Sequence, residues 1–212
     1  VIGAVKRPPF HAQNDAIHRA LPSRSLLPHY NPSAEGTSNV MATRTEQERK
    51  PGMTREILFV TGTRADFGKI EPLALAARDG GFKVSFLVTG MHMLDRYGLT
   101  KIEVHRVQGA TVHEFLNQRE GDPQDTILAK SITGFSDIFA ELRPDLVVFH
   151  GDRIEALACA LVCATNYIRS AHIEGGEVSG TIDEVFRHCN TKLAACHFVS
   201  SEAAAKRVMT LG

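Results

Sequence analysis

The stretch from His172 to Glu184, HIEGGEVSGTIDE, gathers side chains that can move protons. It holds four carboxylates and three glycines directly after an apolar, strand-like run. Crowded carboxylates repel one another, so we expect the pKa of one of them to be raised and to suit a general acid or base near neutral pH. Two alternatives remain open: an acidic turn that begins a helix, or a divalent metal site made by Glu174, Glu177 and Asp183.

A further carboxylate, Asp152, follows the apolar run LVVFH, where a helix should begin. Asp152 could be no more than the N-cap of that helix, a position that Asp fills well. If the strands before Asp152 and Glu174 are neighbours, however, both carboxylates face one crevice. Arg153 then lies beside them and could bind phosphate.

Two more segments follow predicted strands and could contact a ligand. TGTRADFGK carries Arg64 and Lys69, and its small residues together with a helix N-terminus would suit a phosphate. It is neither GxGxxG nor a Walker loop, which argues against nicotinamide and ATP as ligands. His92 follows the next strand and could face the same crevice or be a structural side chain.

The elements that must position these residues alternate between strand and helix. Apolar runs predict strands at 56–62, 82–90, 146–150, 168–174 and 198–201, with a weaker one within 104–115. Helical spacing predicts helices at 69–81, 122–145, 153–166, 181–197 and 201–212, with Asp122 and Ser200 or Ser201 as caps. This order predicts an α/β fold with a doubly wound, Rossmann-like parallel sheet over residues 53–212, in which ligands bind beyond the carboxyl ends of the strands.

Residues 1–52 differ in composition from the rest, because prolines, serines and charges interrupt every hydrophobic period. We expect disorder or a non-native extension there, with at best a short helix over 16–21. A targeting peptide is the alternative.

Bulk composition narrows the functional class. The 212 residues carry 24 basic and 24 acidic side chains, so a nucleic-acid partner is not expected. No apolar run reaches the length of a membrane span and no secretory signal is evident, so we expect no membrane partner and a cytoplasmic protein.

The four cysteines, Cys159, Cys163, Cys189 and Cys196, do not form a CxxC pair. Cys159 and Cys163 lie four residues apart in a helical stretch, and we interpret them as small core residues in a reducing compartment, although they could be half of a zinc site. We expect no bound metal.

TGTRADFGK, GDRIEALA and especially HIEGGEVSGTIDEVFRH resemble the hydrolysing UDP-N-acetylglucosamine 2-epimerases of sialic acid synthesis, over about residues 55–211. The resemblance implies two Rossmann-like domains in the glycosyltransferase-B arrangement, with a UDP-sugar in the cleft between them. It implies conversion of UDP-N-acetylglucosamine and water into UDP and N-acetylmannosamine through a 2-acetamidoglucal. It also implies a homo-oligomer and no cofactor.

The resemblance assigns roles to matched positions. Asp152 and Glu174 become the acid–base pair with Asp183 in support, and Arg64 and Arg153 hold the diphosphate. The full set of predicted substrate-binding residues is Arg64, Lys69, His92, Arg153, Glu177, Arg187 and His188, of which Arg187 and His188 would steady the acidic loop.

The chain departs from this family in length. Family members are nearly twice as long as the matched part, so we expect the second, uridine-binding domain to be missing from these 212 residues. Three other functions stay open: a hydrolysing epimerase of a UDP-2,4-diacetamido-trideoxy sugar on the legionaminic acid route, a non-hydrolysing epimerase, or an inactive nucleotide-sugar-binding domain.

Overall fold

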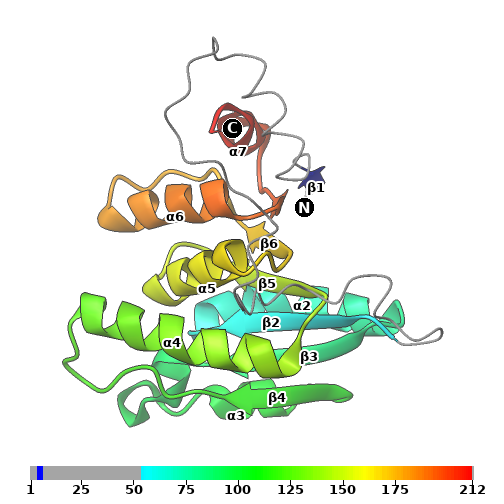
Figure 1. Ribbon diagram of the computed structural model, residues 1–212, viewed down its shortest axis with the longest axis vertical. Coiled ribbons are helices and arrows are strands. Elements are labelled where there is room, and N and C mark those ends of the chain that lie inside the picture. The colour runs from blue at the N-terminus through cyan, green and yellow to red at the C-terminus, as the bar shows by residue number, and fades with distance from the viewer. Residues whose placement is uncertain (1–3, 7–53, 212) are drawn as a thin grey trace, which may run out of the picture.

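The computed structural model describes residues 4–6 and 54–211 of the chain, and these form one sheet with helices on both faces (Figure 1). The strand order is β1-β7-β6-β5-β2-β3-β4, and of the described strands only β1 runs antiparallel to its neighbour. The strands are β1 (Ala4–Lys6), β2 (Glu56–Thr61), β3 (Lys83–Val88), β4 (Ala110–Glu114), β5 (Leu146–His150), β6 (Ser170–Ile173) and β7 (Cys196–Phe198).

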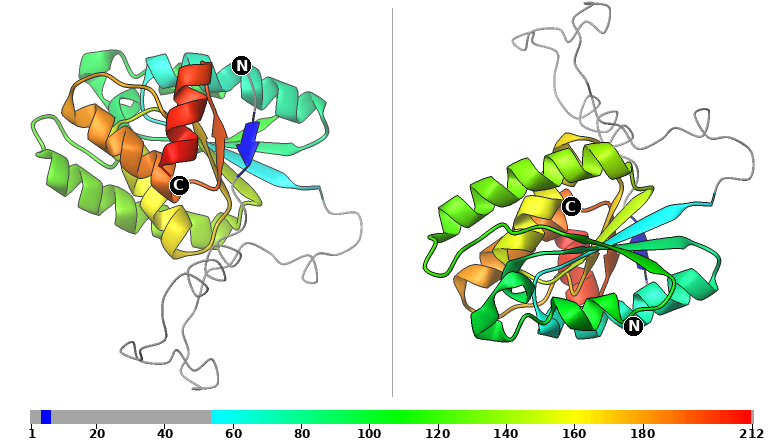
Figure 2. Two further views of the ribbon diagram at one scale, coloured as in Figure 1. Left: turned by 90° about the horizontal axis from the view of Figure 1, so that it is seen from above. Right: turned by 90° about the horizontal axis from the view of Figure 1, so that it is seen from below.

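The helices follow the strands in alternation, as the sequence predicts. They are α2 (Arg64–Asp79), α3 (Lys101–His105), α4 (Gln124–Leu142), α5 (Ile154–Thr165), α6 (Ile182–Leu193) and α7 (Glu202–Thr210), with short 3-10 helices η2 (Gly90–Met93) and η3 (Asp95–Tyr97). Helices α2 and α3 cover one face of the sheet, while α4, α5 and α6 lie side by side over the other (Figure 2). The predicted doubly wound, Rossmann-like α/β fold is confirmed.

Side chains of each central strand alternate between two separate cores. Leu58 and Val60 of β2 face α4 and α5, whereas Phe59 faces α2. A strand covered by helices on both faces is mostly apolar, which is why residues 57–60, ILFV, show no polar alternation. The two cores hold the strand ends in place, and with them the loops that carry the charged residues.

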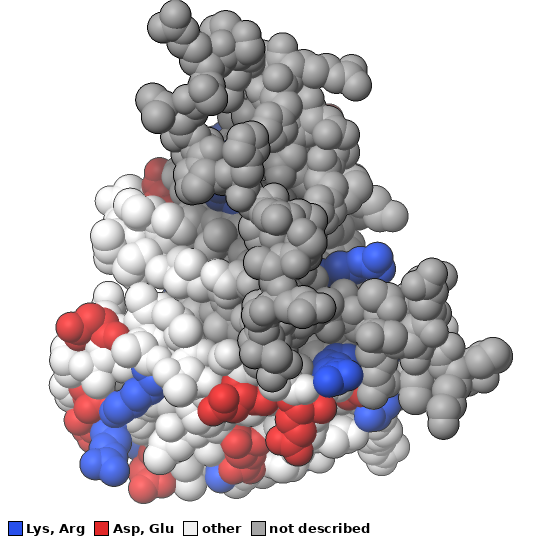
Figure 3. All heavy atoms as spheres, in the orientation of Figure 1, with Lys and Arg blue, Asp and Glu red and all other residues white. Residues whose placement is uncertain are grey.

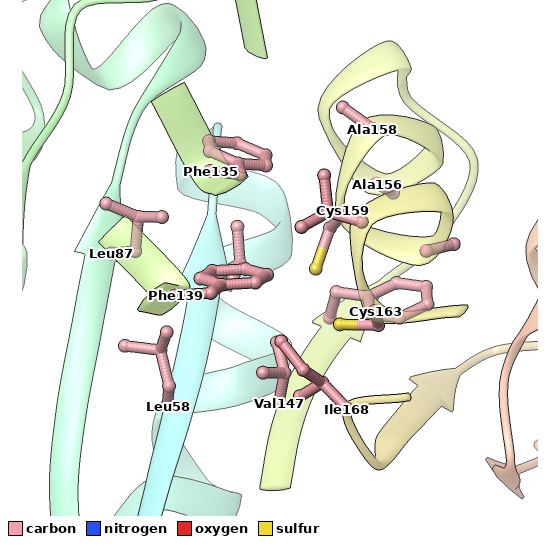
Figure 4. Packing of buried hydrophobic residues seen from close by; sticks show 14 of the residues in the cluster. Leu58, Leu87, Phe135, Phe139, Val147, Ala156, Ala158, Cys159, Cys163 and Ile168 are labelled. Carbon is pink, nitrogen blue, oxygen red and sulfur yellow. The ribbon is translucent and has the colours of Figure 1, made fainter. Parts of the chain in front are cut away.

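The core between α4 and α5 contains the two cysteines that could have been half of a zinc site. Cys159 and Cys163 are fully buried and pack with Phe135 and Phe139 (Figure 4). Burial raises the pKa of the Cys159 thiol well above its usual value, so this group stays a neutral thiol. The interpretation of these cysteines as core residues is confirmed.

Helix α2 begins five residues earlier than predicted. Thr63 caps it: the Thr63 hydroxyl accepts from the Asp66 N–H (3.3 Å), and the Asp66 carboxylate accepts from the Thr63 N–H (2.8 Å). This reciprocal capping box satisfies two helix-end donors and starts the helix at Arg64. Arg64 therefore lies in the first turn of α2 and not in the loop that precedes it.

Two other boundaries also differ from the prediction. Helix α6 ends at Leu193 and β7 spans Cys196–Phe198, so the last strand begins two residues earlier than expected. Asp122 does not cap α4, because its carboxylate accepts from the Arg119 N–H (3.0 Å) and from Lys130 Nζ (2.6 Å). Of the two predicted caps of α7, Ser200 and Ser201, the structure uses Ser201.

The N-terminal segment contributes strand β1, which the sequence did not predict. Ala4–Lys6 pairs antiparallel with Cys196–Phe198 at one edge of the sheet. The expected disorder of residues 1–52 is therefore wrong at 4–6, while the rest of that segment, with the expected helix over 16–21, lies outside the described residues.

The part of the chain described by the structure contains no helix that combines the length and apolar character needed to cross a membrane. Acidic and basic side chains are interspersed over the face shown in Figure 3, in keeping with equal numbers of the two charges.

Candidate functional site

Asp152 and Glu174 follow two neighbouring strands, as the hypothesis of a shared crevice requires. Strands β5 and β6 are parallel with His150 opposite Ile173, and the Gly151 N–H donates to the Ile173 carbonyl (3.0 Å). Each carboxylate therefore lies just past this last backbone bond, at the edge where open α/β sheets bind ligands.

Glu174 is held between two cationic or protonatable groups. Lys69 of α2 donates to Oε1, and His150 Nε2 lies 3.0 Å from Oε2. The Glu174 backbone has φ +62° and its N–H donates to the Phe198 carbonyl (2.8 Å). Partial burial acts to raise the pKa of Glu174, but the hydrogen bond from Lys69 and the charge of His150 outweigh it, and the pKa is lowered.

This result corrects the expectation of a raised pKa in the acidic stretch. Glu174 has Lys69 beside it and Asp152 has Arg187, so neither faces an unscreened carboxylate. A carboxylate with a lowered pKa is ionised at neutral pH and can accept a proton. His150 was not predicted as a site residue, although its place at the end of a strand, just before Gly151 and Asp152, was a usable signal.

Asp152 is paired with Arg187 of α6 and does not cap a helix. Arg187 Nη2 donates to Asp152 Oδ2, with the two side chains only 13% and 21% exposed. The N-cap of α5 is Arg153, without a side-chain capping bond. Arg187 therefore fixes Asp152, and the predicted role of steadying the acidic loop falls to another residue.

That residue is Glu184, which the sequence analysis did not single out. Its Oε2 accepts the backbone N–H groups of Ser179 (2.7 Å) and Gly180 (2.6 Å), and these two bonds lower the pKa of Glu184. Gly180 has φ +72°, a conformation that favours glycine. The carboxylate thus organises the turn that leads into α6.

The remaining acids of the stretch lie apart from Glu174. Glu177 Oε1 accepts from Ser200 and Ser201 (3.4 Å), so it faces the start of α7, and Asp183 is exposed beside Thr181 (3.4 Å). Within residues 54–211, no group of three His, Cys, Asp or Glu side chains is arranged to hold a metal. The alternative metal site is therefore not assembled.

Three predicted substrate-binding residues, Arg64, His92 and His188, lie in three different environments: one is exposed, one is fully buried and one is half-buried. Arg64 is 75% exposed and its Nε lies 3.2 Å from Glu103 Oε1. His92 is fully buried, with Nε2 3.0 Å from Thr61 Oγ1 and Nδ1 2.7 Å from Thr100 Oγ1, and burial lowers its pKa.

His92 is therefore a core side chain that supports the loop after β3, away from the surface where a ligand would lie. His188 is half-buried on α6, and its positive charge contributes to the lowered pKa of Glu184.

A buried polar network supports the loop between β5 and α5. The Gly151 carbonyl accepts from His172 Nε2 (2.7 Å) and from Asn190 Nδ2 (3.1 Å). Burial lowers the pKa of His172 to about 3, so this imidazole is neutral and carries its proton on Nε2. Helix α6 thus holds both Gly151, through Asn190, and Asp152, through Arg187.

A cavity of about 210 Å³ opens beside the carboxylates and not between them. It is lined by the first turns of α4, α5 and α6 and by the segments after β3 and β4, and it includes Arg153 and Asp183. Asp152 and Glu174 do not line it. Arg153, the residue after Asp152, lines the cavity, so the cavity adjoins the strand end that carries Asp152.

Sequence comparisons identify relatives of this chain. A profile of the family described as UDP-N-acetylglucosamine 2-epimerase matches residues 74–212. A UDP-N-acetylglucosamine 2-epimerase from Neisseria meningitidis serogroup B is 44% identical over 159 residues, covering 74% of this chain and 42% of the relative. A UDP-N,N'-diacetylbacillosamine 2-epimerase (hydrolyzing) from Legionella pneumophila is 38% identical over 165 residues, covering 76% and 44%.

Solved structures show the same fold. UDP-GlcNAc 2-epimerase from Neisseria meningitidis, bound to UDP-GlcNAc, aligns with a TM-score of 0.62 at 21% identity, over 73% of this chain and 42% of that one. The enzyme from Methanocaldococcus jannaschii aligns with a TM-score of 0.63 at 20% identity, over 73% and 42%.

The chain spans about two fifths of the length of the curated relatives that it matches. With most of its residues matched by the family profile and its fold shared with solved members, the chain belongs to the UDP-N-acetylglucosamine 2-epimerase family.

Proposed function

We propose that this chain is the N-terminal, carboxylate-bearing part of a hydrolysing UDP-N-acetylglucosamine 2-epimerase, which forms UDP and N-acetylmannosamine. The observation that carries the proposal is the placement of Asp152 and Glu174 just past the paired ends of β5 and β6, each beside a cation. Inversion at a sugar carbon needs one group to remove a proton and another to return one.

In the first step Glu174 removes the proton from C2 of the sugar. The C1–oxygen bond breaks, UDP leaves with that electron pair, and a C1=C2 double bond forms, which gives the 2-acetamidoglucal. Lys69 and His150 keep Glu174 in the ionised form that can take the proton, while the lowered pKa makes it a weaker base than the sequence predicted, so its position at the strand end carries the assignment.

In the second step water adds across the double bond. Its hydroxyl joins C1, a proton joins C2 on the opposite face, and the proton held by Glu174 passes to solvent. Asp152, fixed by Arg187, handles the returning proton, with Asp183 in support.

The departing diphosphate is bound by Arg64 and Arg153. Guanidinium groups form bidentate hydrogen bonds with phosphate and stabilise the charge that develops as UDP leaves. The high exposure of Arg64 leaves it free to exchange Glu103 for a phosphate.

A second candidate substrate is a UDP-2,4-diacetamido sugar. The 38% identical Legionella pneumophila relative bears the name of a hydrolysing UDP-N,N'-diacetylbacillosamine 2-epimerase. Such a substrate leaves the chemistry at C1 and C2 unchanged and differs at C4 and C6.

The same proposal implies a second domain and an oligomeric state for the complete protein. The chain spans about two fifths of its relatives, so we propose that a second domain completes the UDP site and that the complete protein forms a homo-oligomer. On this basis the 212-residue chain alone should show little or no turnover.

The test compares the chain alone with a version continued beyond 212 to the length of its relatives. Both UDP-sugars are supplied in D₂O, and products are followed by NMR. Free N-acetylmannosamine with deuterium at C2, together with UDP, supports the proposal. UDP-N-acetylmannosamine without free sugar indicates a non-hydrolysing enzyme, and binding without turnover indicates an inactive domain.

The matched variants are Glu174→Gln and Glu114→Gln in the longer version. Glu114 also lies between a lysine and a histidine, with Lys101 Nζ and His105 Nε2 both at 2.7 Å, but at the end of edge strand β4. Glu174→Gln should abolish turnover without unfolding the protein, while Glu114→Gln stays active. Normal turnover by Glu174→Gln removes Glu174 from the mechanism.

A further inference from the structure

Glu155, in the first turn of α5, is a buried carboxylate to which the scheme above gives no role. It is 2% exposed, and among the described residues neither of its oxygens accepts a hydrogen bond. Its carboxylate lies against two loop backbones: a Cβ added to Gly90 would be 2.8 Å from Oε1, and one added to Gly62 would be 3.5 Å from Cδ. The absence of side chains at these glycines leaves the space that Glu155 fills.

A neighbouring carboxylate shows how unusual this is. Asp66 is also buried beside the loop at Gly62, yet it accepts from Thr61 Oγ1 (2.8 Å) and from the N–H groups of Gly62 (3.0 Å) and Thr63 (2.8 Å). The loop thus satisfies Asp66 and leaves Glu155 without a donor. A buried polar group without a hydrogen bond requires an explanation.

The compensating group for Glu155 is Arg153. Arg153 Nε forms an ion pair with Glu155 Oε2 at 3.3 Å, without hydrogen-bond geometry. The arginine side chain is 37% exposed, and it lines the cavity together with Asp183. A guanidinium has five N–H groups, and one of them is on Nε. An arginine turned to Glu155 through Nε keeps the four N–H groups of its planar end for the cavity.

We propose that Glu155 is a positioning residue, which fixes the guanidinium of Arg153 so that its terminal N–H groups bind the diphosphate of the substrate. This inference rests on the proposed function, which assigns Arg153 to the diphosphate. The buried carboxylate restricts the rotation of a long, half-exposed side chain, and the arginine is thereby ordered before the ligand arrives. Glu155 acts through Arg153 and does not touch the ligand.

The test is a double-mutant cycle on UDP affinity, measured by calorimetry in the longer version of the protein. Glu155→Gln keeps the size of the side chain and removes its charge, and Arg153→Ala removes the guanidinium. Each single variant should weaken UDP binding about tenfold, and the double variant should bind no more weakly than Arg153→Ala alone. If Glu155 has only a structural role, the fold-losses of UDP affinity in the two single variants should multiply in the double variant, and that result would overturn the proposal. Wild-type UDP affinity in Glu155→Gln would also overturn it.

A second variant covers the case in which Glu155→Gln does not fold. Arg153→Lys keeps the positive charge, but one compact ammonium group cannot contact Glu155 and a diphosphate in the same forked manner. UDP affinity as low as in Arg153→Ala supports the proposal, and near wild-type affinity contradicts it.

UDP affinity also separates this inference from the epimerase proposal. If the protein binds UDP but forms no N-acetylmannosamine, the proposed reaction is refuted. The double-mutant cycle on UDP affinity can still be measured, and it still tests the role of Glu155. A wild-type protein that does not bind UDP refutes both.

Discussion

Lys69 of α2 donates a hydrogen bond to Glu174 at the end of β6, across 105 residues of sequence. The same carboxylate lies 3.0 Å from His150 at the end of β5. Three elements therefore converge on one ionised carboxylate. Its charge state, and with it the ability to accept a proton, is set by tertiary structure.

Replacing Lys69 should change the titration of Glu174. Partial burial is the largest single influence on the pKa of Glu174 and acts to raise it. Lys69→Met removes the strongest of the Lys69 and His150 contacts that together outweigh burial, so the pKa should rise toward or above its usual 4.5. Lys101→Met is the matched control, because Lys101 is the main cause of the lowered pKa of Glu114. Carboxyl ¹³C NMR titration should show each lysine variant raising the pKa of its own partner alone.

Replacing Arg187 should destabilise the fold more than replacing an exposed arginine. Arg187→Met leaves the largely buried Asp152 without its cation, and we expect a loss of about 1–3 kcal/mol in the free energy of unfolding. Arg96→Met breaks a pair with Glu120 whose side chains are 65% and 66% exposed, which should cost less than about 1 kcal/mol. Urea denaturation compares the two, and equal losses would contradict the role of burial.

His172 should make the protein sensitive to mild acid. Below pH 6.5 the unfolded chain protonates this histidine, whereas folded His172, with its pKa of about 3, stays neutral. Protonation thus favours the unfolded state, and stability falls as the pH decreases from 6.5 toward 3. His172→Gln keeps a donor for the Gly151 carbonyl and should remove about 2 kcal/mol of the stability difference between pH 7 and pH 5.

The control for that experiment is Asn190→Leu. Asn190 also donates to the Gly151 carbonyl but has no group that titrates. Its loss should lower the free energy of unfolding by a similar amount at both pH values. If His172→Gln shows the same pH dependence as wild type, burial of a neutral histidine is not the cause of acid sensitivity.

Two helix glycines should respond oppositely to alanine. A Cβ at Gly134 in α4 would lie 2.0 Å from Phe115 Cζ, so Gly134→Ala should displace the ring and cost about 1–3 kcal/mol. Nothing lies within 4 Å of a Cβ at Gly68 in α2, where alanine should stabilise by about 0.5–1 kcal/mol. Thermal unfolding of both variants tests the close approach of α4 to Phe115.

The fold class and most element positions could be predicted from local sequence patterns. Continuous apolar runs such as 146–150 mark strands buried on both faces, and the helical spacing of 124–142 marks a helix with one buried side. These patterns also placed Asp152 and Glu174 after strands, because the period of side chains and the residues that end an element are local properties. The start of α2 was missed because its capping box, Thr63 with Asp66, was taken for loop.

The charge pairing within the site depends on how the elements pack and could not be predicted from local patterns. Lys69 and Arg187 reach their carboxylates across 105 and 35 residues, and His150 and Glu155 acquire significance through packing against neighbouring strands and loops. Charge pairing acts through space over a few ångströms and depends on how elements pack, so no local pattern encodes it. The sequence therefore indicated which acids lie at the strand ends, and the packing determined which cations hold them.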